Sequence, residues 1–145
     1  MTGERTAFPF LETEFDEREP MFSPDQKWLA YRSNESGRDE VYVRAFPKGE
    51  GRWVISTAGG VTPQWRSDGR ELFYQNNRDI WAVSIEPAAT GLEVGEPRRL
   101  FDIGMGSAGW AVARDGQRIL VGHGVEGRAP GVMTVTINWA ATLRD

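Results

Sequence analysis

The chain has 145 residues, of which 39% are hydrophobic and 26% charged, with a net charge of −4 and no cysteine. This length suits one domain with its own core, and the composition excludes a disordered chain and a disulfide scaffold. The missing thiols exclude thiolate zinc sites, iron–sulfur clusters and cysteine nucleophiles. The acidic net charge argues against a nucleic-acid partner. The sequence contains no run of 18 apolar residues, so no membrane-spanning helix is expected.

Short segments rich in Val, Ile, Trp, Tyr and Phe alternate with Gly, Pro, Asn and Asp along the whole chain. No sustained helical periodicity interrupts them, so the sequence predicts an all-β fold of short antiparallel strands. In chain order the expected strands are 8–13, 19–22, 27–33, 40–46, 52–56, 62–66, 71–75, 79–85, 97–101, 109–113, 118–122 and 132–138.

Three of these segments share one motif, in which an apolar residue is followed by two further residues and then by aspartate. The aspartates are Asp25, Asp68 and Asp115, spaced 43 and 47 residues apart, and Gly69 and Gly116 follow the second and third. Asp accepts a hydrogen bond from its own backbone two residues on, and Gly tolerates positive φ, so Asp-Gly between strands predicts a tight hairpin. These five residues are therefore interpreted as structural turn residues.

Recurring carboxylates also suggest a metal or acid–base site. Because the three aspartates occupy equivalent positions in different repeats, each is expected to serve its own turn, and they should not converge. The Gly-rich run at 104–109 precedes a strand and hairpin, whereas a dinucleotide fingerprint opens a helix. We therefore assign no catalytic, cofactor-binding or metal-binding residue and expect no cofactor.

A period near 40–45 residues with four strands per repeat is typical of a β-propeller blade. The predicted repeats are 8–57, 58–101 and 102–139, flanked by tails at 1–7 and 140–145. The third repeat ends after three strands, and the segment at 8–13 is interpreted as an unpaired fourth strand. The sequence thus predicts about three four-stranded antiparallel blades.

The segment Phe22-Ser-Pro-Asp25, together with Asp68-Gly69 and Asp115-Gly116, resembles the WD-like β-propeller repeats of TolB-type proteins. The stretch at 31–47 is similar to the C-terminal propellers of large bacterial proteins, including some membrane-anchored serine/threonine kinases. The resemblance implies a propeller domain from a larger bacterial protein. It leaves the compartment open, although the N-terminus lacks the features of a signal peptide.

Closed propellers have about 4–8 blades, so three blades make an incomplete ring. Two completions are considered. The chain is the C-terminal half of a longer six-bladed ring, or two copies form a homodimer in which each N-terminal strand completes the other copy's third blade.

The resulting functional prediction is a non-catalytic interaction or sensor module that binds a protein or a small ligand at a propeller face. Candidate ligand-binding loops are 57–63 and 104–109, and Trp110 is the best candidate for an exposed aromatic platform. The alternative is a propeller that is part of, or accessory to, a hydrolase, either a peptidase or a glycosidase. The candidate ligand-loop residues are Thr62, Gln64, Ser107 and Trp110.

Overall fold

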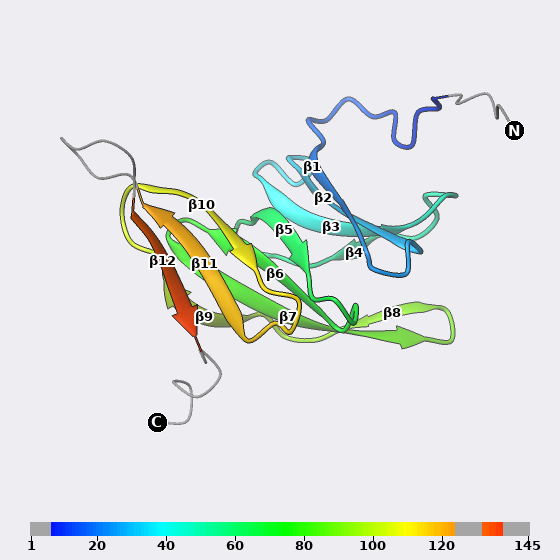
Figure 1. Cartoon of the computed structure of the whole chain (residues 1–145). Coiled ribbons are helices and arrows are strands. Elements are labelled where there is room, and N and C mark those ends of the chain that lie inside the picture. The colour runs from blue at the N-terminus through cyan, green and yellow to red at the C-terminus, as the bar shows by residue number, and fades with distance from the viewer. Residues whose placement is uncertain (1–6, 124–131, 138–145) are drawn as a thin grey trace, which may run out of the picture.

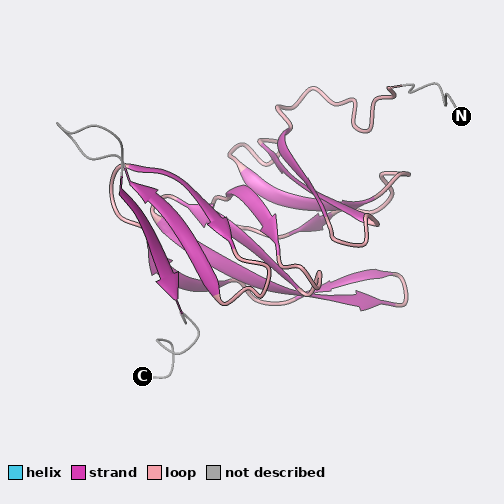
Figure 2. Cartoon of the chain, in the orientation of Figure 1, coloured by secondary structure: helices cyan, strands magenta, loops and turns pink. Residues whose placement is uncertain are grey.

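The computed structural model describes residues 7–123 and the backbone of residues 132–137. The expected tails at 1–7, apart from residue 7 itself, and at 140–145 lie outside this range. The described residues form strands and loops without a helix (Figure 2). The strands are β1 (Arg18–Phe22), β2 (Trp28–Ser33), β3 (Glu40–Ala45), β4 (Trp53–Val54), β5 (Val61–Trp65), β6 (Glu71–Asn76), β7 (Asp79–Ala88), β8 (Gly91–Val94), β9 (Arg98–Asp102), β10 (Ser107–Val112), β11 (Arg118–His123) and β12 (Val132–Ile137).

The strands build three antiparallel sheets that follow one another along the chain (Figure 1). Blade 1 contains β1–β4 in sequential order, blade 2 contains β5–β9, and blade 3 contains β10–β12. Blade 2 lies in the middle of the array. The prediction of all-β propeller blades is confirmed by this arrangement.

The first hairpin of each blade has the same register. Phe22 pairs with Leu29, Trp65 with Leu72, and Val112 with Ile119. Each innermost strand (β1, β5 and β10) also carries an irregularity in register at its start. The three repeats recognised in the sequence are therefore three copies of one backbone geometry.

The aspartates shape the turns of these hairpins. The carboxylate oxygen Oδ1 of Asp25, Asp68 and Asp115 accepts the backbone N–H two residues on, at 3.1, 3.0 and 2.9 Å. The residue after each aspartate has positive φ: 59° at Gln26, 72° at Gly69 and 68° at the third. Gln26 thus adopts the left-handed conformation that the other two repeats give to glycine.

Two apolar clusters hold the blades together. The first joins blade 1 to blade 2 and includes Ala30, Val43, Leu72 and Tyr74. The second joins blade 2 to blade 3 and includes Phe73, Ile80, Ile119 and Val121. Alternate residues of β6 enter different clusters, because successive side chains of a strand point to opposite faces. Blade 2 is consequently buried on both faces.

Two strand predictions were wrong. Residues 8–13 form loop and not a strand, and Phe10 packs on Phe46 of blade 1 with ring centroids 5.5 Å apart. The strand predicted at 79–85 continues to Ala88 and turns back as β8, a hairpin that blade 1 lacks. Pro87 and Gly91 lie within this extension because both residue types are tolerated at the edge of a two-stranded hairpin.

Candidate functional site

The four residues predicted to bind ligand lie on β5 and β10, the first strands of blades 2 and 3, and three of them make hydrogen bonds between blades. The side-chain amide of Gln64 donates to the carbonyl of Trp110 at 2.8 Å and accepts from the N–H of Val112 at 3.0 Å. The N–H of Thr62 donates to Oε2 of Glu19 at 2.6 Å. These groups already have partners within the chain.

The idea that Trp110 offers an exposed platform is wrong for the single chain. Its side chain lies in the cluster between blades 2 and 3, and the residue is 8% exposed. Position 107, expected in a Gly-rich loop, is the first residue of β10 and pairs with His123. The structure therefore does not gather the four predicted residues into one pocket among the described residues.

A groove of about 490 Å³ lies instead where the first hairpins of blades 1 and 2 meet the β7–β8 hairpin. We name it the turn-face groove. Its apolar wall comes from Trp28, Ile85, Pro87 and Leu92, and its polar rim comes from Ser23, Asp25, Ser67, Asp68 and Arg70.

The β7–β8 hairpin closes the outer side of this groove. It leaves blade 2 and projects beneath blade 1 (Figure 1). Gly91, with φ of 135°, lies so close to Trp53 that an added Cβ would come within 2.1 Å of the indole. Trp53 in turn makes an edge contact with Trp28 at 5.2 Å between ring centroids. A glycine is required here because only a bare backbone can approach the indole this closely.

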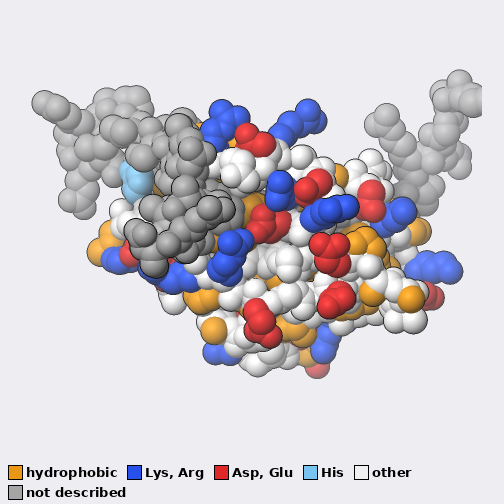
Figure 3. Space-filling view, turned by 90° about the horizontal axis from the view of Figure 1, so that it is seen from below, with side chains coloured by type: hydrophobic (Ala, Val, Ile, Leu, Met, Phe, Trp, Pro, Cys, Tyr) orange, Lys and Arg blue, Asp and Glu red, His pale blue; other side chains and the backbone are white. Residues whose placement is uncertain are grey.

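The charge on the rim is mixed, with an acidic excess. Burial by itself raises the pKa of Asp25, but hydrogen bonds from the Ser23 hydroxyl and the backbone of Lys27 outweigh it and hold the pKa below its usual range. Asp68 forms an ion pair with Arg66 at 3.4 Å. Acidic and basic side chains are interspersed over the face seen in Figure 3.

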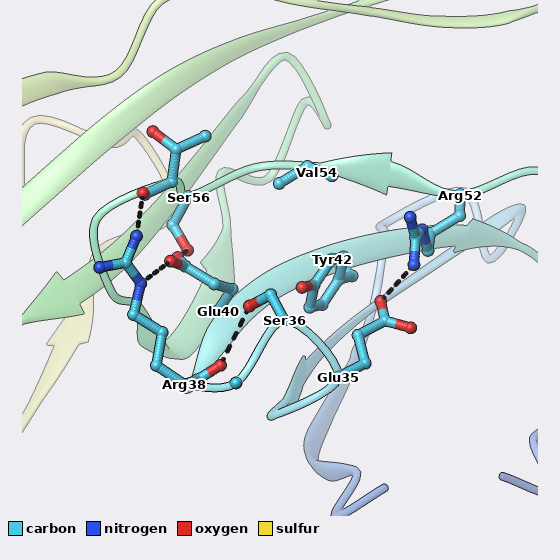
Figure 4. A pocket seen from close by; sticks show the side chains of 10 residues that line it. Glu35, Ser36, Arg38, Glu40, Tyr42, Arg52, Val54 and Ser56 are labelled. Carbon is cyan, nitrogen blue, oxygen red and sulfur yellow. Dashed lines mark hydrogen bonds and ion pairs between the residues drawn. The ribbon is translucent and has the colours of Figure 1, made fainter.

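A second hollow, of about 540 Å³, lies on blade 1 (Figure 4). Arg38 and Arg52 occupy its two ends, with Tyr42 between them. Arg52 pairs with Glu35 at 2.9 Å and its guanidinium lies 5.5 Å from the Tyr42 ring centroid. Both arginines are thus neutralised by carboxylates of the same hollow, so it offers no uncompensated charge to an ionic ligand.

Glu40, at the edge of this hollow, was missed as a special residue by the sequence analysis. Its side chain is 3% exposed. One carboxylate oxygen accepts from Arg38 Nε at 2.7 Å and from the N–H of Gly59 at 2.9 Å, and the other accepts from the Ser56 hydroxyl. A buried carboxylate with this many donors anchors the linker between blades 1 and 2.

Within residues 7–123 and 132–137, no group of three or more His, Asp or Glu side chains is arranged to hold a metal ion. The aspartates of the three turns belong to separate hairpins. In the same residues there is no helix long and apolar enough to cross a membrane.

Comparison with known proteins finds similarity only at the level of solved structures. No protein-family model matches the sequence, and no curated protein matches it either. Oligogalacturonate lyase from Vibrio parahaemolyticus superposes over 78% of this chain with a TM-score of 0.61 and 15% identity. Acylaminoacyl peptidase from Pyrococcus horikoshii superposes over 86% with a TM-score of 0.57 and 15% identity. TolB from Acinetobacter baumannii aligns at a TM-score of 0.47 and 18% identity.

These similar structures are β-propeller proteins, and the chain has the same fold. At 15% identity the likeness shows the architecture alone. The chain spans 31% of the lyase chain and 23% of the peptidase chain. It therefore corresponds to only part of each of those chains.

Proposed function

We propose that the chain is a non-catalytic interaction module of the TolB-like propeller class, within a larger bacterial protein, and that it binds its partner in the turn-face groove. The observation that carries this proposal is the β7–β8 hairpin, which only blade 2 has among the described blades and which walls a groove between two repeats. The hairpin packs on blade 1 through Leu92 and Gly91 and, with Pro87, also supplies one wall of the groove.

The groove's chemistry defines the class of partner. Trp28, Pro87 and Leu92 supply an apolar wall, and the Asp25 carboxylate on the rim is exposed and ionised at neutral pH. An extended peptide segment with a basic side chain next to an apolar one matches this surface, since the apolar group gains from burial and the cation from the carboxylate.

A selection from a library of extended peptides tests this proposal. We expect enrichment of Lys or Arg beside an apolar residue, and a several-fold weaker binding of selected peptides by Asp25→Asn. This substitution keeps the side-chain oxygen that caps the turn and removes the charge. Asp115→Asn is the matched control, because it makes the same change in a turn outside the groove. Equal loss in both variants, or no enrichment, would refute the proposal.

The alternative function is a propeller that belongs to a hydrolase. It is favoured by the occurrence of an acylaminoacyl peptidase among the similar structures. In the described residues the turn aspartates, Glu40 and Glu71 have structural partners of their own. Turnover of model peptides or oligosaccharides by the purified chain, retained on further purification and lost on changing one carboxylate, would decide for this alternative.

A further inference from the structure

The first strands of successive blades are joined by hydrogen bonds between the same two repeat positions, although the atoms differ. Between blades 1 and 2, the Trp65 indole N–H donates to the carbonyl of Met21 at 3.1 Å. Between blades 2 and 3, the N–H of Val112 donates to the side chain of Gln64 at 3.0 Å. In the hairpin register Trp65 and Val112 occupy equivalent positions. Gln64, which directly precedes Trp65, is the equivalent of Met21. The same pair of positions therefore meets at each joint.

Continuing this step beyond blade 3 identifies the residues that would meet at a third joint. The position of Met21 and Gln64 is held by Ala111 in blade 3, and the position of Trp65 and Val112 is held by Phe22 in blade 1. Ala111 is exposed and lines two hollows of about 280 and 340 Å³, whereas the Phe22 ring is left 47% exposed. A small residue beside hollows and an exposed aromatic ring are complementary in shape.

Blade 1 carries a stacked aromatic pair equivalent to one that blade 2 uses on its face toward blade 1. Tyr31 and Tyr42 stack with centroids 5.8 Å apart, and Tyr74 and Trp81 stack at the equivalent positions of blade 2 at 6.3 Å. In blade 2 this pair faces the cluster shared with blade 1. In blade 1 the pair lies on the face turned away from blade 2 and is already buried within the single chain, with Tyr31 3% and Tyr42 2% exposed. The open part of this face is the hollow of Figure 4 and the exposed Val54 beside it.

We infer that this face receives blade 3 of a second copy of the chain, so that two copies close a six-bladed ring with a two-fold axis and Phe22 of each copy seats against Ala111 of the other. Three blades fall below the range of about 4–8 in closed propellers, and two sets of three fall within it. A two-fold pairing creates both missing joints from one pair of surfaces, which leaves neither end open.

The mass of the purified chain in sedimentation and light scattering tests this inference. We expect about twice 16.2 kDa. Phe22→Arg and Ala111→Arg should each give monomers, since either places a charge in the joint. Met105→Arg is the control, because Met105 is exposed but belongs to neither face. Asp25→Asn should stay dimeric, so failure of the peptide-binding proposal is distinguishable from failure of this one.

Cross-linking keeps the test decisive if an arginine variant fails to fold. The chain has no cysteine, so Phe22→Cys and Ala111→Cys proteins carry one thiol each. A short bismaleimide should link the two proteins only after mixing, and Met105→Cys mixed with Ala111→Cys should give no product. If the chain stays monomeric at concentrations up to about 1 mM, where even weak association is populated, the inference is overturned. Further blades of a longer chain would then be the occupant of this face. A dimer without this cross-link would overturn the assigned joint.

Discussion

Replacing Glu40 with alanine should destabilise the chain far more than the equivalent change in blade 2. Glu40 pairs in register with Ser33, just as Asp79 pairs with Asn76, so the two acids begin equivalent strands. Their surroundings differ. The Glu40 side chain is nearly inaccessible, whereas Asp79 is partly exposed and pairs with Arg99 at 2.7 Å.

The magnitude follows from the donors that Glu40→Ala leaves behind. The buried Ser56 hydroxyl and the partly buried Gly59 N–H lose their acceptor. An unpaired buried donor costs about 1–3 kcal/mol, and the partly buried one less. Arg38 is 60% exposed and can be solvated again, so its loss adds little. The expected destabilisation is about 2–4 kcal/mol for Glu40→Ala, against about 0–1 kcal/mol for the exposed ion pair lost in Asp79→Ala.

Urea unfolding followed by far-UV circular dichroism measures both variants. The Glu40 variant should show a markedly lower midpoint with an unchanged slope. Glu40→Gln should recover part of the loss, because its amide oxygen can still accept from one donor. Equal and small effects in the two alanine variants would refute the reasoning that the carboxylate anchors the linker between blades.

Three further predictions concern the turns, the titrating carboxylates and the joint between blades 2 and 3. Gln26→Gly should stabilise the chain by about 0.5–1 kcal/mol in urea unfolding, since glycine removes the cost of positive φ, and Gly69→Gln should destabilise it by about 1 kcal/mol. The pKa of Glu71 is raised because burial outweighs its arginine partners. Its contribution is therefore present at low pH and lost as pH rises, so wild type should lose stability relative to Glu71→Gln between about pH 4 and 7. Asp25, whose pKa is lowered, contributes with the opposite sign: its contribution is complete above about pH 4 and is lost as pH falls further, so wild type should lose stability relative to Asp25→Asn on acidification below about pH 4. A stability difference that does not change with pH in either range would contradict the corresponding assignment. Gln64→Ala should lower the free energy of unfolding by about 1–3 kcal/mol in the same urea assay. A loss below about 0.5 kcal/mol would contradict the view that the Gln64 hydrogen bonds stabilise the joint between blades 2 and 3.

The sequence was sufficient for the repeats because their turns are local. Asp68 and Gly69 act within one hairpin, and the three consecutive apolar residues of β6, Leu72 to Tyr74, indicate a strand buried on both faces without knowledge of its neighbours. The position of β8 was not predictable in this way. Its pairing with β7 is local, but Pro87 and Gly91 indicate a loop unless the indole of Trp53, far away in sequence, is known to lie against it.

The candidate site depended even more on long-range placement. Asp25 and Asp68 were recognised as turn residues, yet the groove between them exists only because two hairpins and the β7–β8 extension meet in space. Gln64 was singled out as a ligand residue from its place in the chain, and the structure uses its amide to connect inner strands. Hydrogen bonds of this kind leave no signature in a single sequence.

Backbone nuclear Overhauser effects across the innermost hairpins test the three-blade account most directly. The account predicts contacts for Phe22 with Leu29, Trp65 with Leu72, and Val112 with Ile119, together with a contact from the Trp65 indole proton to Met21 in the neighbouring blade. Absence of any one of the three registers, or sequential contacts typical of helix in these segments, would contradict it.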